Sequence, residues 1–175
     1  MAERWVALLR GINLGARNRV AMADLRRVFE AAGCTDVATY IQSGNVVFSS
    51  RVRDHRALGR KLERAIADEL GVETRVVVRT GDELREVIDA NPFGADTSQT
   101  HVAFLAEKPA AAAIRALEAE DVAPDELEVA GHDVFLRFPN GVQGARLSGA
   151  LLERRLGVPG TVRNWRTVER LATLL

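Results

Sequence analysis

The chain has 175 residues, of which 47% are hydrophobic and 27% are charged, and its formal net charge is zero. This composition is typical of a folded globular protein, with enough apolar material for one domain or two small ones. The zero net charge excludes a global attraction to DNA or to anionic membranes. The single cysteine, Cys34, excludes an intrachain disulfide and a cysteine-cluster metal site. No apolar run approaches the roughly 18 residues of a membrane span, so we expect a cytoplasmic protein without a membrane partner.

The first 80 residues are predicted to form strands and helices in an alternating order. Apolar periodicity and turn residues predict a strand at 4–11, a helix at 22–33, two strands within 36–50, a helix at 54–71 and a strand at 72–80. Gly44 supplies the left-handed conformation that a tight turn between the two middle strands needs. Asp54 and Gly71 are suitable caps for the second helix. The order strand, helix, strand, strand, helix, strand is that of a ferredoxin-like unit.

The pattern repeats after a connecting helix, which starts at Thr80 and Glu83 with the spacing of a capping box. The repeat comprises a strand at 101–107, a helix at 108–120 with Pro109 in its first turn, two strands within 125–139, a helix at 147–157, a strand at 160–164 and a terminal helix capped by Asn164. Matching segments carry matching patterns, since "WVALL" parallels "HVAFL" and "NVVF" parallels "DVFL".

These patterns predict an α+β fold of two tandem ferredoxin-like (βαββαβ) subdomains with antiparallel sheets, packed into one compact body. The subdomains are predicted at residues 1–80 and 100–175, with a connecting helix and loop at 81–99. The alternative is an α+β protein without internal duplication, because many such proteins can be divided in this way.

Four stretches of the sequence resemble a bacterial family known as domain of unknown function 1697. They are "LLRGINLGARNRVAMADLR", "TYIQSGNVVF", "NPF" and the long "FPNGVQGARLSGALLERRLGVPGTVRNWRTVERL". The resemblance covers essentially the whole chain and implies two ferredoxin-like subdomains, but it implies no activity. Members of the family usually have a Ser-Lys pair where this chain has Ala145 and Arg146. A serine nucleophile or a lysine amine is therefore not available there, whereas a contact to an anion is.

The segment "GINLGARNR" follows the first strand and gathers glycine, asparagine and arginine. Backbone N–H groups at a strand–loop–helix junction can bind phosphate, although this glycine spacing matches neither the P-loop nor the dinucleotide fingerprint. We predict a loop that binds an anion or another polar ligand. The alternative is a solvated loop whose asparagines bond their own backbone. The candidate residues of this loop are Arg10, Gly11, Asn13, Arg17 and Asn18.

Two further polar stretches complete the predicted site. In the strand order 4-1-3-2 of a ferredoxin-like sheet, the exit of the first strand faces the start of the third, so Gln42, Ser43 and Asn45 should lie near the first loop. The alternative is that "QSGN" is only a good turn. Near the C-terminus, Arg163 precedes a helix whose dipole it opposes, which predicts a carboxylate or a bound anion as its partner. We include Arg163 and Asn164 among the candidate ligand-binding residues.

The sequence is compatible with three functions. The first is binding of a phosphate-bearing small molecule, with nucleic acid less favoured because aromatic residues make up only 5% of the chain and base stacking needs them. The second is an enzyme acting on a small phosphorylated or polar substrate, with unknown catalytic residues, because these stretches hold no histidine or acidic base. The third is a protein-interaction module such as a homodimer. We expect no cofactor and no metal site, because His55, His101 and His132 lack metal-ligand spacing, and we expect His55 and His132 at the surface.

Overall fold

The computed structural model describes all residues from Met1 to Leu175 and contains eight strands and six helices. The chain divides into two compact units. The first unit comprises Met1–Arg85 and Leu171–Leu175, and the second comprises Glu86–Arg170. Each unit contains one four-stranded antiparallel sheet, so the fold is α+β.

The first unit is formed by β1 (Glu3–Leu9), α1 (Met22–Ala31), β2 (Thr35–Tyr40), β3 (Asn45–Ser50), α2 (His55–Leu70) and β4 (Val76–Thr80). Its sheet has the order β2-β3-β1-β4, and every neighbouring pair is antiparallel. This is the strand order 4-1-3-2 that the sequence predicts. The end of β1 consequently lies beside both the start of β3 and the start of β4.

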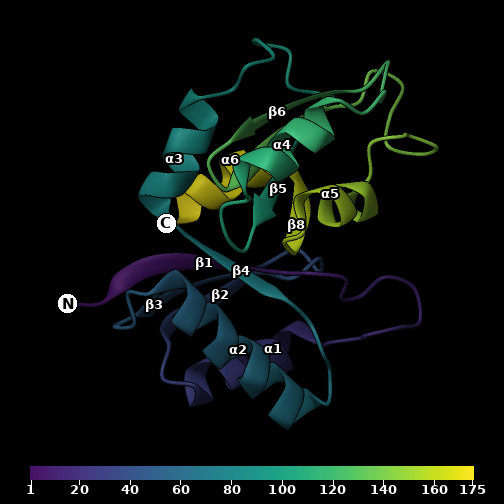
Figure 1. The fold of residues 1–175 in the computed structure, drawn as a ribbon. Coiled ribbons are helices and arrows are strands. Elements are labelled where there is room, and N and C mark those ends of the chain that lie inside the picture. Colours follow the sequence, from purple (N-terminus) through teal and green to yellow (C-terminus); the bar gives the residue numbers. More distant parts are fainter. The chain divides into compact units, whose positions relative to one another are not determined.

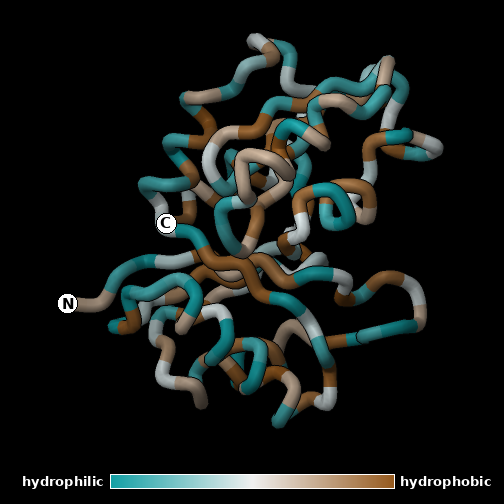
Figure 2. Tube along the Cα trace, in the orientation of Figure 1, coloured by the Kyte–Doolittle hydropathy of each residue, from teal (hydrophilic) through white to brown (hydrophobic).

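Side chains along a strand point alternately to the two faces of the sheet, and this explains how the first unit forms its core. Trp5, Ala7 and Leu9 of β1 point to one face and join a cluster of buried apolar residues from α1 and α2. Within this cluster the rings of Phe29 and Phe48 meet edge to face at 5.3 Å. Both helices cover the same face of the sheet (Figure 1). Hydrophobic colours are concentrated in the strands at the centre of Figure 2, whereas hydrophilic and hydrophobic colours alternate along α2.

The second unit is formed by β5 (Thr100–Leu105), α4 (Ala111–Glu118), β6 (Glu126–Ala130), β7 (Asp133–Arg137), α5 (Gly149–Leu156) and β8 (Gly160–Asn164). Its sheet has the order β6-β7-β5-β8, which corresponds strand for strand to the first sheet. Two more helices, α3 (Gly81–Asp89) and α6 (Trp165–Leu174), each cross a boundary between the units.

The start of α4 differs from the sequence prediction. Pro109 precedes the N-cap residue Ala110 and lies outside the helix, rather than in its first turn. The first helical hydrogen bond is donated by the Ile114 N–H to the Ala110 carbonyl at 3.1 Å. The helix therefore begins two residues after the proline.

The predicted capping box at the start of α3 is confirmed, and a histidine joins it. The Thr80 N–H donates to Glu83 Oε2 at 2.7 Å, and the Glu83 N–H donates to Thr80 Oγ1 at 3.3 Å. His55 Nε2 lies 2.9 Å from Glu83 Oε1, and its ring packs edge to face on Trp5. His55 is therefore half-buried and paired, rather than a simple surface residue. Burial alone would raise the pKa of Glu83, but these hydrogen bonds lower it below its ordinary value.

Replacing Glu83 with glutamine should lower the free energy of unfolding by about 1 kcal/mol at pH 7, because the cap keeps an oxygen but loses its charge. A lowered pKa in the folded state means that the carboxylate stabilises the fold above the unfolded-state pKa. That contribution is lost as the pH falls through the lower folded-state value. The difference between Glu83→Gln and the wild type should therefore shrink below pH ~4.5. Urea unfolding of both proteins at several pH values measures this difference in stability. Glu86→Gln, on the exposed side of α3, is the control, and an equal loss in both variants would contradict the prediction.

Candidate functional site

The connection between β1 and α1 is a long loop with a defined shape. It comprises the twelve residues 10–21 and extends away from the sheet in Figure 1. Gly11, Asn13, Gly15 and Asn18 all have positive φ angles, between 50° and 64°. The Asn13 N–H donates to the Asn18 carbonyl at 3.0 Å, so the middle of the loop closes on itself as a small hairpin.

Asn13 joins this loop to the β2–β3 turn. Its Nδ2 donates to the carbonyls of Val20 at 3.0 Å and Gln42 at 2.9 Å, and its Oδ1 accepts from the Val20 N–H at 2.8 Å. The loop and the turn are therefore in contact, as expected from the strand order. The same bonds occupy the polar atoms of Asn13 with backbone groups, so its side chain holds the loop in place.

Asn45 and Ser43 shape the turn itself. Asn45 is fully buried, and its Nδ2 donates to the Tyr40 carbonyl at 3.0 Å and to Ser43 Oγ at 2.9 Å. The Gly44 carbonyl accepts from the Leu9 N–H at 2.9 Å. Asn45 thus lies inside the turn rather than on a surface that a ligand could reach.

Replacing Asn13 with alanine should lower the free energy of unfolding by about 1.5 kcal/mol. The variant loses three hydrogen bonds and a residue that tolerates a positive φ angle. Asn18→Ala is a matched control, because Asn18 also has a positive φ but makes one long bond, to the Gly11 carbonyl at 3.4 Å. Denaturant unfolding of both variants measures the difference, and equal losses would show that the bonds of the Asn13 side chain to Val20 and Gln42 contribute nothing.

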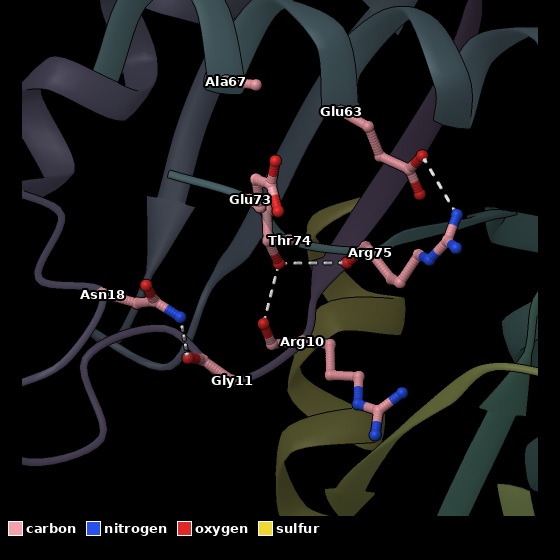
Figure 3. A pocket seen from close by; sticks show the side chains of 8 residues that line it. All are labelled: Arg10, Gly11, Asn18, Glu63, Ala67, Glu73, Thr74 and Arg75. Atoms are coloured by element: carbon pink, nitrogen blue, oxygen red, sulfur yellow. Dashed lines mark hydrogen bonds and ion pairs between the residues drawn. The ribbon is translucent and has the colours of Figure 1, made fainter. Parts of the chain in front are cut away.

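A pocket of about 560 Å³ lies where β1 ends, beside the C-terminal half of α2 and the segment that enters β4. Its lining residues are Arg10, Gly11, Asn18, Glu63, Ala67, Glu73, Thr74 and Arg75 (Figure 3). Backbone contacts fix its floor. The Arg10 N–H donates to the Arg75 carbonyl at 3.0 Å, and the Thr74 hydroxyl donates to the Arg10 carbonyl at 2.7 Å.

The pocket carries charges of both signs. Arg75 Nη1 lies 3.8 Å from Glu63 Oε2, and Glu63 Oε1 also accepts from the Val76 N–H at 2.9 Å. Both carboxylate oxygens of Glu63 therefore have partners within the protein, whereas Glu73 is exposed and lines the pocket. In Figure 3 the Arg10 guanidinium extends away from the Thr74 hydroxyl. The space at Gly11 is open to a ligand, because a Cβ added at this position would have no neighbour within 4 Å.

The remaining loop residues lie around a second hollow. A pocket of about 340 Å³ on the loop is lined by Asn13, Gly15, Arg19, Val20, Ala21 and Gln42. Arg17 is exposed and lines neither pocket. The predicted loop residues are thus divided, with Arg10, Gly11 and Asn18 at the larger pocket and Asn13 and Gln42 at the smaller one.

Arg163 and Asn164 belong to the second unit, and the larger pocket is formed without them. The Arg163 guanidinium is buried and donates to Thr161 Oγ1 at 2.7 Å and to the Val162 carbonyl at 3.0 Å. Burial lowers the pKa of Arg163 to about 10. Asn164 caps α6, because its Oδ1 accepts from the Thr167 N–H at 2.8 Å, which confirms the predicted cap.

Sequence reasoning missed five of the eight residues that line the larger pocket, namely Glu63, Ala67, Glu73, Thr74 and Arg75. The signal was available, because the strand order 4-1-3-2 places the start of the fourth strand beside the end of the first. The predicted site includes only the third strand as a neighbour of the first. The missed residues add two carboxylates to stretches that by themselves contain no acidic group.

No group of three or more histidine, cysteine, aspartate or glutamate side chains is arranged to hold a metal ion. None of the helices combines the length and the apolar composition needed to cross a membrane. Burial raises the pKa of the Cys34 thiol to about 11, although the Lys61 charge acts in the opposite direction. A thiol with so high a pKa is a poor nucleophile at neutral pH.

The fold and the pocket define an α+β protein of two four-stranded antiparallel sheets, with a polar pocket at the end of its first strand. The family model described as "Protein of unknown function (DUF1697)" matches residues 2–135, and the chain belongs to that family. The matched range includes the first loop and the hairpin turn but ends before Ala145 and Arg146. The description of the family states no function.

Comparison with solved structures gives the same architecture. The structure of a conserved bacterial protein, SP0830 from Streptococcus pneumoniae, is similar over 99% of this chain and 98% of that chain, with a TM-score of 0.74 and 22% sequence identity. At this identity the likeness shows the fold alone. A comparison with curated proteins found no match.

Proposed function

We propose that the pocket at the end of β1 binds a small hydroxylated molecule that carries a phosphate or carboxylate group. The anionic group lies between Arg10 and Arg75, which line the pocket from backbone positions joined by a hydrogen bond of 3.0 Å. Hydrogen bonds between an arginine and an anionic oxygen are among the stronger ones in proteins. The exposed Glu73 and the Asn18 amide are suited to hydroxyl groups of the same ligand.

The observation that carries this proposal is a comparison between the two halves of the chain. In the second unit, the equivalent connection from β5 to α4 has only the five residues 106–110, whereas the connection from β1 to α1 has twelve. The junctions are otherwise alike, because the Ala106 N–H donates to the Pro159 carbonyl at 2.9 Å, as Arg10 donates to Arg75. The fold therefore needs only a short connection, and the additional ordered residues of the first loop support a role in binding.

The other predicted residues act indirectly in this proposal. Asn13, Gln42, Ser43 and Asn45 hold the loop against the turn and thereby position Gly11 and Asn18. Arg17 is exposed and lines neither pocket, so we assign it no contact with the ligand.

A thermal-shift screen against sugar phosphates, nucleotides and hydroxy acids tests the proposal. A ligand present at ~100 times its dissociation constant should stabilise the protein by about 2.7 kcal/mol. Arg10→Gln and Arg75→Gln should each weaken binding by about 10- to 100-fold, because each loses a charge-assisted bond worth about 1.5–3 kcal/mol. Arg115→Gln in α4 changes the charge equally, far along the chain from the pocket residues, and should bind normally. A ligand whose affinity is the same in all three variants would contradict this assignment.

An enzyme acting on a small phosphorylated or polar substrate is the second candidate. Glu73 supports it, because an exposed carboxylate on the pocket supplies the general base that the loop lacks. Turnover of a ligand by the wild type, and binding without turnover by Glu73→Gln, would favour this candidate over simple binding.

We further propose that the two sheets form tandem ferredoxin-like subdomains at residues 1–80 and 100–175, joined by 81–99, in a cytoplasmic protein. The corresponding strand orders and the corresponding junction hydrogen bonds support the duplication. The division of the chain into two compact units differs from these boundaries, since it places the division between Arg85 and Glu86 and groups Leu171–Leu175 with the first unit.

A further inference from the structure

Helix α2 carries a row of arginines on the side opposite its buried residues. Leu58, Leu62 and Ile66 are buried in the core of the first unit. Arg56, Arg60 and Arg64 are exposed, and they are spaced four residues apart. Residues at this spacing follow one another along a helix face at intervals of about 6 Å. The three guanidinium groups therefore form a line along the outer surface of α2, which we call the arginine row.

No ion pair within the protein engages the arginine row. None of its three side chains forms a hydrogen bond or an ion pair in the structure. Two of the nearby acidic residues are engaged elsewhere, since Asp54 accepts from the Ala57 N–H at the N-cap and Glu63 accepts from the Val76 N–H. Asp68, four residues after Arg64, is exposed and forms no ion pair with the row. Like charges four residues apart destabilise a helix by about 0.2–0.5 kcal/mol per pair. The row thus carries a small cost that no contact within the chain offsets.

A shallow hollow beside the row extends the basic surface. Its volume is about 340 Å³, and it is lined by Arg60, Lys61 and Arg64, by the small residues Ala32, Ala57 and Ala65, and by Asp68. The single carboxylate among these residues leaves an excess of positive charge. The alanine side chains are short, so they leave room for a ligand to approach the neighbouring basic side chains.

The chemistry of this surface favours one class of partner. Membrane-binding helices bury an apolar face in the lipid, but the apolar face of α2 is already buried in the core. Protein interfaces are centred on aromatic or other apolar anchors, and none of the exposed large apolar residues, Met1, Leu14, Ile41 and Val142, lies on α2. Binding of single-stranded nucleic acid relies on aromatic stacking, and α2 has no aromatic residue besides His55. An exposed helix with a line of cations instead fits phosphates along a duplex, and the major groove of DNA is wide enough to admit a helix.

We propose that the arginine row, with Lys61, binds the phosphate backbone of double-stranded DNA without reading its sequence. This inference is independent of the proposed small-molecule pocket.

Fluorescence anisotropy of a labelled DNA duplex of about 24 base pairs, titrated with the full chain in ~50 mM salt, tests the proposal. The triple variant Arg56→Gln/Arg60→Gln/Arg64→Gln should bind at least tenfold more weakly than the wild type. The slope of log K against log salt should decrease in magnitude by about 2.7, because each phosphate contact contributes about 0.9. Folding should be unaffected, because these side chains have no contacts to lose and glutamine is a good helix former. Circular dichroism checks this point.

The control is Arg115→Gln/Arg154→Gln/Arg166→Gln, which removes the same charge from exposed positions on other helices. It should bind DNA within about twofold of the wild type. Equal weakening in both triple variants would overturn the proposal, as would absence of saturable binding by the wild type. Tighter binding to polyglutamate, to anionic phospholipid vesicles, to duplex RNA or to single-stranded DNA would assign the surface to another partner and would also overturn it.

Discussion

Replacing Gly44 with alanine is expected to lower the free energy of unfolding by about 3 kcal/mol, because strain and crowding act together. Gly44 has a φ angle of +86°, and an added Cβ would lie 2.9 Å from Leu9 Cβ and 3.0 Å from the side chain of Ile12. These neighbours belong to the end of β1 and the start of the first loop. The clash would therefore push the β2–β3 turn away from the segment that carries Arg10 and Gly11.

Gly141→Ala is the control for Gly44→Ala. Its φ angle of +81° is nearly the same, but an added Cβ would have no neighbour within 4 Å. It should lose only the strain component, about 1 kcal/mol. Urea unfolding of both variants separates the two effects. Losses of equal size would mean that the turn does not pack against β1 as closely as described.

The second large effect is expected at Gly59, where α2 approaches β4. A Cβ on Gly59 would lie 2.9 Å from the Val76 carbonyl oxygen, which is a backbone atom and cannot simply rotate away. Alanine would add about 1 kcal/mol of helix propensity, but moving α2 off the strand should cost more, for a net loss of about 2–3 kcal/mol. The shift would also lengthen the 2.9 Å bond from the Val76 N–H to Glu63, which lines the pocket.

Gly149→Ala, in contrast, is expected to raise the free energy of unfolding. Gly149 is also helical, as the first residue of α5, and an added Cβ there would have open space. Alanine should stabilise the protein by about 0.5 kcal/mol. Thermal or urea unfolding of both glycine variants tests the contrast, and a stabilised Gly59→Ala would contradict the close contact between α2 and β4.

Much of the fold could be predicted from the sequence because its signals are local. The hairpin glycine at 44, the capping box of Thr80 and Glu83 and the Asn164 cap each depend on a few neighbouring residues, and each appears in the structure. The prediction of Pro109 in the first turn of α4 is wrong, because a proline suits both the first turn and the position just before it. The strand order followed from the sequence of elements rather than from any single residue.

The site could be predicted only in part. Arg10, Gly11 and Asn18 can be predicted because they belong to one polar loop, whereas Arg75 and Glu73 reach the pocket through the pairing of β4 with β1. The burial of Asn45 follows from packing around the turn, which composition does not reveal. The arginine row cannot be predicted from the net charge, which averages over the chain and conceals a local excess on one helix face.

The central claim is that Arg10 and Arg75 form an anion-binding pocket at the end of β1. The most direct test is a two-dimensional ¹H–¹⁵N NMR titration of the full chain with inorganic pyrophosphate. We expect saturable shifts that are largest at the amides of Gly11, Thr74 and Arg75 and at the side-chain Nε of Arg10. Absence of saturable shifts, or shifts confined to the arginine row of α2, would contradict the claim.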